Sequence, residues 1–94
     1  MILFSSEALS DIERVRSFLE LRNPQAASRA IRAIWTALER LESTPHLGQP
    51  TKSRNIRQIV VRFGRGGYIV RYQVLAPDDA ILVTRVWHGR EARP

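Results

Sequence analysis

Apolar residues recur at helical spacing in two consecutive segments of the first half of the chain. In the first segment the apolar positions from Ala8 to Leu19 lie three or four residues apart, and Ser5 or Ser6 precedes them as a candidate N-cap. This pattern predicts a helix that ends near Arg22. The polar residues between the apolar positions are expected on the solvent side of this helix: Asp11, Glu13, Arg14 and Arg16.

The second helical segment begins at Asn23-Pro24, where a good N-cap precedes a residue favoured at the first helical position. The helix must end before Pro45, because proline cannot continue it. Its apolar residues form one broad face: Ala27, Ala30, Ile31, Ile34, Ala37, Leu38 and Leu41. Since the connection at Asn23 is short, the two helices are expected to form an antiparallel hairpin.

The second half of the chain changes to β-branched and aromatic runs separated by turn residues. Strands are predicted over residues 59–63, 68–75 and 81–88, with turns at Gly64, Gly66 and Gly67 around Arg65 and at Pro77-Asp78-Asp79. Both connections are too short for a parallel crossover, so the pattern indicates an antiparallel meander.

The segments together predict one α+β domain over residues 1–94. Ile2-Leu3-Phe4 can supply an edge strand before the helices. The expected order is β-α-α-β-β-β, with the two-helix hairpin packed on one face of a small antiparallel sheet. Glu91 to Pro94 carry no pattern that predicts regular structure.

Strict alternation along the last strand places apolar residues on both faces of the sheet. It assigns Ile81, Val83, Arg85 and Trp87 to one face and Leu82, Thr84, Val86 and His88 to the other. A helical hairpin covers only one face, so an apolar surface edged by arginines would need a second polypeptide. Alternatively, Leu82 and Val86 are ordinary half-exposed strand residues.

The charge of the chain points to a polyanionic or acidic partner. The formal net charge is +6, and no acidic residue lies between Glu42 and Asp78. Six basic residues lie inside that gap: Lys52, Arg54, Arg57, Arg62, Arg65 and Arg71. A nucleic acid, a ribosome and an acidic protein all fit such a surface, as does a general contribution to solubility.

Several classes of protein are disfavoured by the residues present. The chain has no cysteine and no apolar run near the length of about 20 residues that a membrane span needs, so we expect a soluble, cytoplasmic protein. His46 and His88 lie in different elements without a carboxylate cluster, which argues against a metal site. Tyr68 and Tyr72 alternate with valines and are interpreted as core residues. Arg85 needs a carboxylate partner, either one of this chain such as Glu20 or Glu42, or one of a bound protein.

The chain resembles the RelE/ParE superfamily of toxins from bacterial type II toxin–antitoxin modules, and most of all the ParE branch. The residues that carry the likeness span nearly the whole chain: Ser5-Ser6-Glu7-Ala8, Asn23-Pro24-Gln25-Ala26-Ala27, Pro45-His46-Leu47-Gly48-Gln49-Pro50, Arg57-Gln58-Ile59-Val60-Val61, Tyr68-Ile69-Val70-Arg71-Tyr72 and Arg85-Val86-Trp87-His88-Gly89-Arg90.

The resemblance implies a toxin that a cognate antitoxin holds inactive. It implies a ParD-like antitoxin with an acidic C-terminal segment, which typically wraps the toxin, and DNA gyrase as the target of the free toxin. No cofactor, metal or membrane is expected. The residues expected to bind target or antitoxin are Arg57, Arg62, Arg65, Arg71, Arg85, Trp87, His88 and Arg90.

The resemblance to the RelE branch implies an alternative, metal-free cleavage of mRNA in the ribosomal A site. In that case Arg62, Arg71 and Arg85 would bind phosphate, and His88 or Tyr72 would transfer a proton. The segment after His88 has no terminal tyrosine, and the basic loop has a single lysine. These departures favour the non-enzymatic gyrase inhibitor over the endoribonuclease.

Overall fold

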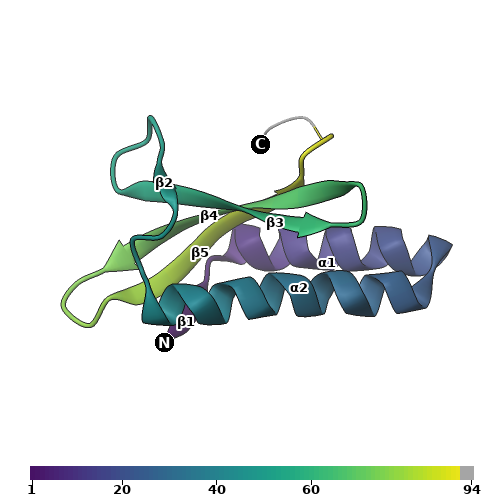
Figure 1. Cartoon of the computed structure of the whole chain (residues 1–94), viewed down its shortest axis with the longest axis horizontal. Coiled ribbons are helices and arrows are strands. Elements are labelled where there is room, and N and C mark those ends of the chain that lie inside the picture. Colours follow the sequence, from purple (N-terminus) through teal and green to yellow (C-terminus); the bar gives the residue numbers. More distant parts are fainter. Residues whose placement is uncertain (92–94) are drawn as a thin grey trace.

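Two helices lie against one face of a five-stranded sheet in the computed structural model, which describes residues 1–91 (Figure 1). The expectation for residues 92–94 lies outside the described residues. The elements in chain order are β1 (Ile2–Phe4), α1 (Ser6–Arg22), α2 (Pro24–Ser43), β2 (Gln49–Pro50), β3 (Ile56–Phe63), β4 (Gly66–Leu75) and β5 (Ala80–His88). Within residues 1–91, neither helix is long and apolar enough to span a membrane.

Side-chain caps begin both helices where the sequence predicts them. The Ser5 hydroxyl accepts a hydrogen bond from the Ala8 N–H at 3.1 Å and so caps α1. The Asn23 side chain accepts from the N–H groups of Gln25 and Ala26 at 3.0 and 3.2 Å and so caps α2. The same Asn23 ends α1, because its own N–H donates to the Leu19 carbonyl. One residue therefore closes the first helix and opens the second, which confirms the predicted hairpin.

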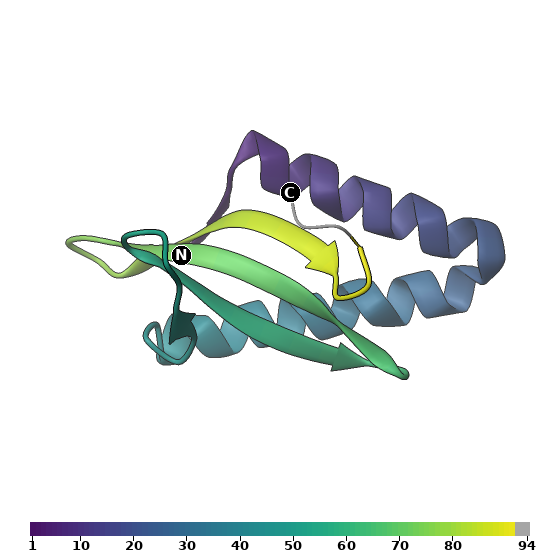
Figure 2. The same cartoon turned by 90° about the horizontal axis from the view of Figure 1, so that it is seen from above.

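The sheet has the strand order β1-β5-β4-β3-β2, and Figure 2 shows it from above. Strands β3, β4 and β5 form the predicted antiparallel meander. The sheet is nevertheless mixed, because β1 pairs with β5 in parallel. The two-residue strand β2 was not predicted. The first turn is also tighter than expected, since Gly64 takes the left-handed conformation and Gly66 and Gly67 already belong to β4.

A β-bulge in β5 overturns the assignment of faces made from strict alternation. Arg71 pairs with Arg85, but the next residue of β4, Tyr72, pairs with Val83, so β5 carries one extra residue. Beyond the bulge the two faces exchange. Val86 is fully buried on the helix side, opposite Val70, and Trp87 lies on the other face, opposite Ile69. Val86 is therefore core and not part of an uncovered surface.

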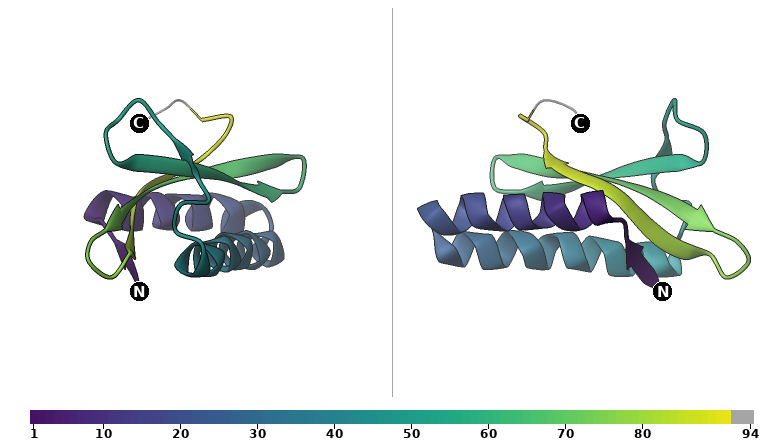
Figure 3. Two further views of the ribbon diagram at one scale, coloured as in Figure 1. Left: turned by 60° about the vertical axis from the view of Figure 1, so that its left-hand side comes forward. Right: turned by 180° about the vertical axis from the view of Figure 1, so that it is seen from behind.

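The hydrophobic core lies between the helices and the sheet. Figure 3 shows these two layers from two sides. The predicted stripe of α2 supplies Ala27, Ala30, Ile34, Leu38 and Leu41, all of them buried. The sheet contributes Val61, Tyr68, Val70, Tyr72, Ile81, Val83 and Val86. The opposite face of the sheet has no helix over it within residues 1–91.

Candidate functional site

The sheet face without helices carries an apolar row bordered by arginines. We call it the outer face, and it is formed by Gln58, Val60, Arg62, Ile69, Arg71 and Trp87. Strand register places Val60 beside Ile69 and Ile69 beside Trp87. Val60 is 61% exposed, whereas Trp87 is buried, with the Arg71 guanidinium 4.8 Å from its ring centroid. The expectation of an uncovered apolar surface is thus met by Val60 and its neighbours.

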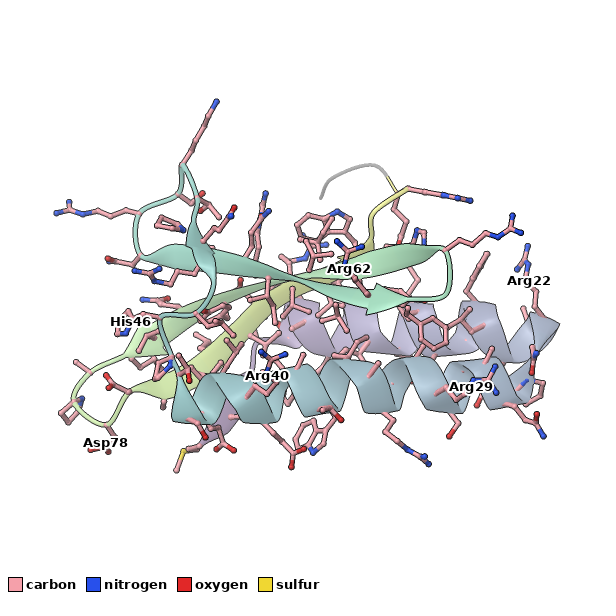
Figure 4. All side chains as sticks on the ribbon, viewed as in Figure 1. Arg22, Arg29, Arg40, His46, Arg62 and Asp78 are labelled. Carbon is pink, nitrogen blue, oxygen red and sulfur yellow. The ribbon has the colours of Figure 1, made fainter. Side chains whose placement is uncertain are left out.

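The arginines of the outer face and of the neighbouring turn differ in how firmly the protein holds them. Arg62 is exposed and projects from the side of the sheet opposite the helices (Figure 4). Arg65 is exposed in the turn between β3 and β4. Neither has a hydrogen-bond or ion-pair partner among residues 1–91. Arg71 is half-buried over Trp87, and its Nε donates to the Gln58 side chain at 3.4 Å.

Arg85 is held by a buried carboxylate on α1. Its Nε and Nη2 donate to the two carboxylate oxygens of Asp11 at 2.8 and 3.1 Å, a bidentate ion pair. Asp11 is 2% exposed, and among residues 1–91 it is the only charged residue that is buried. The prediction that Glu20 or Glu42 pairs with Arg85 is wrong, because Glu20 pairs with Arg16 and Glu42 with the N-terminal amine. Asp11 was expected on the solvent side of its helix, which is also wrong.

The side chains of Asp11 and Arg14 form hydrogen bonds with the edge of β5 at a point where no strand pairs with it. Strand β1 pairs only with Ile81, Leu82 and Val83, so the backbone of Val86 lies beyond its reach. The Val86 N–H donates to Asp11 at 2.8 Å, and its carbonyl accepts from Arg14 Nη2 at 3.2 Å. Both groups of this edge residue are therefore satisfied by side chains of α1.

The pKa of Asp11 reflects these bonds. Burial by itself raises the pKa, but hydrogen bonds from Arg85, the Val86 N–H and Arg14 outweigh it, and the pKa lies below its ordinary value. The pKa of Arg85 is raised, chiefly by its hydrogen bonds to Asp11. Both shifts favour the charged pair. Arg85 is consequently a structural residue of the α1–β5 contact as much as a surface cation.

Arg57 and Tyr72 clamp the loop that leads from α2 to β3. The Arg57 guanidinium donates to the Gly48 carbonyl at 2.7 Å and to the His46 carbonyl at 3.3 Å. The buried Tyr72 hydroxyl donates to the Pro45 carbonyl and accepts from the Gly48 N–H, both at 2.8 Å. Burial raises the pKa of Tyr72. Arg57 and Tyr72 therefore act within the fold, and Tyr72 is a core residue as predicted.

His88 lies on the helix side of the sheet, away from Arg62 and Arg71. It pairs with Tyr68, and their rings meet edge to face at 5.3 Å. Its Nδ1 accepts from the Arg90 N–H at 3.1 Å, while the Arg90 side chain is exposed. The sheet thus stands between His88 and the outer-face arginines.

The structure brings together only part of the predicted set of site residues. Arg62, Arg71 and Trp87 share the outer face, whereas Arg57, Arg85 and His88 are engaged elsewhere. Sequence reasoning missed Asp11, although a usable signal was present. Asp11 is three residues after Ala8 and four before Val15, so it lies on the buried stripe of α1.

Comparison with known proteins identifies relatives over nearly the whole chain. The family model described as "ParE toxin of type II toxin-antitoxin system, parDE" matches residues 2–93. Toxin RelE3 of Caulobacter vibrioides is 38% identical over 86 residues, 92% of this chain and 90% of that protein. Toxin RelE1 of the same organism is 35% identical over 92 residues, 98% of this chain and 96% of that protein.

Solved structures share the fold. A chain of the chromosomal ParDE toxin–antitoxin system from P. aeruginosa has a TM-score of 0.72 at 16% identity, covering 93% of this chain and 92% of that one. A chain of the intact E. coli RelBE toxin–antitoxin complex has a TM-score of 0.67 at 15% identity, covering 97% and 98%. At such identities the likeness establishes the architecture of two helices on a five-stranded mixed sheet.

Proposed function

The chain belongs to the ParE toxin family of type II toxin–antitoxin systems, within the RelE/ParE superfamily, and we propose that it is a binding toxin that inhibits DNA gyrase. An acidic, ParD-like antitoxin neutralises it in the cytoplasm. The related structures are toxin–antitoxin complexes, which supports an antitoxin as partner. The basic surface of the chain, with a net charge of +6, supports an acidic one.

The observation that carries the binding mechanism is the separation of the candidate catalytic groups. Metal-free cleavage of RNA needs a proton-transfer group and phosphate-binding cations around one phosphate. Here His88 faces the helix side, whereas Arg62 and Arg71 belong to the outer face. Arg85 is bound to Asp11. This arrangement supports a surface that binds a target over one that assembles a nuclease centre.

The outer face is the surface we assign to the target. Arg62 is an exposed cation without a partner among residues 1–91, and Val60 offers an exposed apolar contact beside it. An apolar centre with a charged rim is typical of protein–protein interfaces. Arg71 and Trp87 would then act as a rigid base beneath the contact.

The alternative function is ribosome-dependent mRNA cleavage. It is kept because two relatives above 30% identity carry the name RelE. Such cleavage would require His88 and the outer-face arginines to act from opposite sides of the sheet, or it would require a different set of catalytic residues.

One experiment distinguishes the two functions. Purified, antitoxin-free protein is added to gyrase supercoiling of plasmid DNA and, separately, to a reconstituted translation reaction in which mRNA integrity is followed. We expect inhibited supercoiling and intact mRNA. Codon-spaced cuts with unaffected gyrase would overturn the proposal in favour of the nuclease, and no effect in either reaction would overturn both.

A further inference from the structure

The solvent side of α2 carries three arginines in one line. Arg29, Arg32 and Arg40 are exposed, and their spacing along the helix places them on one face together with Thr36. None of the three arginine side chains has a hydrogen-bond or ion-pair partner among residues 1–91. Figure 4 shows Arg29 and Arg40 well separated along α2. We call these three residues the arginine row.

The acidic residues of α2 do not pair with the arginine row. They are Glu39 and Glu42. Glu42 pairs with the N-terminal amine at 2.7 Å. Glu39 is exposed and lies about 100° around the helix from Arg40. On α1, by contrast, the exposed carboxylate of Glu20 is paired with an arginine of the same helix. The exposed side of α2 therefore presents unpaired positive charge, and that of α1 presents ion pairs.

The spacing of the arginine row fits the phosphate backbone of duplex DNA. At a rise of about 1.5 Å per residue, Arg32 and Arg40 are about 12 Å apart along the helix axis. The major groove of B-DNA is about 12 Å wide, so the two guanidinium groups can contact phosphates on opposite sides of it, with Arg29 beside Arg32. The major groove of A-form RNA is narrow and deep, and cations at this spacing do not match it. The row therefore favours duplex DNA over duplex RNA.

The position of α2 allows this contact to coexist with the proposed contact to gyrase. Helix α2 packs against β3, whereas α1 packs against β5. Figure 2 shows α2 on the same side of the molecule as β3, with α1 on the other side. Strand β3 supplies Val60 and Arg62 to the outer face. The arginine row and the outer face are thus neighbouring but separate surfaces, one for each component of a gyrase–DNA complex.

We propose that the arginine row binds the phosphate backbone of duplex DNA, so that the toxin engages gyrase on DNA and not gyrase alone. This inference rests on the proposed function and adds DNA as the second component of the target. The contact is made to phosphates and is therefore independent of base sequence. It weakens with rising salt concentration, because each bound phosphate releases condensed counterions.

The first measurement uses the full-length toxin alone with a short fluorescein-labelled DNA duplex, by fluorescence polarisation at several salt concentrations. We expect the double variant Arg32→Ala, Arg40→Ala to raise Kd about tenfold at low salt and to reduce the slope of log Kd against log salt concentration by about 2. The matched control is Lys52→Ala, Arg54→Ala, which removes the same charge from exposed positions outside α2. The control should change Kd less than about threefold.

The second measurement tests the arginine row on gyrase. The double variant Arg32→Ala, Arg40→Ala should raise about fivefold the toxin concentration that half-inhibits supercoiling of plasmid DNA. Its Kd for gyrase without DNA should stay within about twofold of the wild-type value, because the outer face is intact. Circular dichroism of both double variants verifies that they are folded.

The outcomes separate this inference from the proposed function. Equal losses of DNA binding in the two double variants would show that net charge alone attracts DNA and would overturn the arginine row. Equal affinity of the wild type for an RNA duplex of the same length would overturn the preference for DNA. Inhibition of gyrase by a toxin that does not bind DNA would overturn this inference and leave the proposed function in place. DNA binding through the row without inhibition of gyrase would overturn the proposed function instead.

Discussion

The two faces of the sheet are formed by the same strands but differ in their role, since one is buried in the core and the other has no helix over it. The face toward the helices carries Val61, Val70, Val83 and Val86, all nearly or completely inaccessible, in one core with α1 and α2. The outer face carries Val60, the most exposed valine of the sheet, between arginines. Residues adjacent in sequence, such as Val60 and Val61, therefore differ in role because successive side chains point to opposite faces.

The arginines show the same contrast. Arg85 lies at the edge of β5 and is bound to a buried carboxylate, while Arg62 and Arg65 are exposed without a partner among residues 1–91. A cation that stabilises the fold through an ion pair cannot bind a target instead without a loss of stability. Exposed cations that contact only water can bind a target without that loss. Site assignment from residue type alone would treat all of these arginines alike.

The largest difference between the faces is expected from a pair of valine substitutions. Val86→Ala should lower the free energy of unfolding by about 2–3 kcal/mol, because it removes buried methyl groups and leaves a cavity. Val60→Ala should change it by at most about 0.5 kcal/mol. Urea unfolding of both variants at neutral pH measures this. Equal losses would mean that the bulge does not place Val86 in the core.

The next largest effect on the free energy of unfolding is expected at the contact between α1 and the edge of β5. Asp11→Asn should lower the free energy of unfolding by about 1–3 kcal/mol at pH 7, since charged hydrogen bonds to Arg85, Arg14 and Val86 are weakened. Because the folded-state pKa of Asp11 lies below the ordinary 3.8, this stability is present above that value and is lost as pH falls through the folded pKa. The difference in the free energy of unfolding between wild type and Asp11→Asn should therefore become smaller on acidification.

Urea unfolding of wild type and Asp11→Asn at pH 7, 5 and 3 measures this dependence. Glu13→Gln is the control for loss of an α1 carboxylate at a solvent-exposed position, where the hydrogen bonds from Arg16 lower the pKa. A difference between wild type and Asp11→Asn that stays constant over the whole range would contradict the role given to the Asp11 carboxylate.

The smallest effect on stability is expected at Arg62. Arg62→Ala should change the free energy of unfolding by no more than about 0.5 kcal/mol, because the side chain is exposed. It should nevertheless weaken inhibition of gyrase supercoiling if the outer face contacts the target. Arg85→Ala should instead lose stability, since it leaves Asp11 without its bidentate partner. Full inhibition by Arg62→Ala, verified as folded, would remove Arg62 from the target surface.

Sequence reasoning succeeded where the determinants are local. The caps at Ser5 and Asn23 and the turn residues between the strands act within a few residues of where they stand. The resemblance to toxins of the RelE/ParE superfamily was confirmed by the family match and by the fold of related structures. The clustering of basic residues between Glu42 and Asp78 also follows from the sequence alone.

The candidate site depended on contacts between distant segments. Asp11 and Arg85 are 74 residues apart, so no local pattern links them, and burial of Asp11 becomes intelligible only when its partners are known. The faces of β5 depended on a single extra residue, because one insertion in a strand reverses every side chain beyond it.

The sequence by itself determined the helical hairpin, the meander, the family and the excess of positive charge, since periodicity, caps and composition are properties of the chain as written. Tertiary structure alone decided which arginines are free and which are bound, that His88 lies across the sheet from Arg62, and that Glu91 reaches Arg14. The physical reason is that pairing and burial depend on the neighbours that folding brings together, and those neighbours lie far apart along the chain.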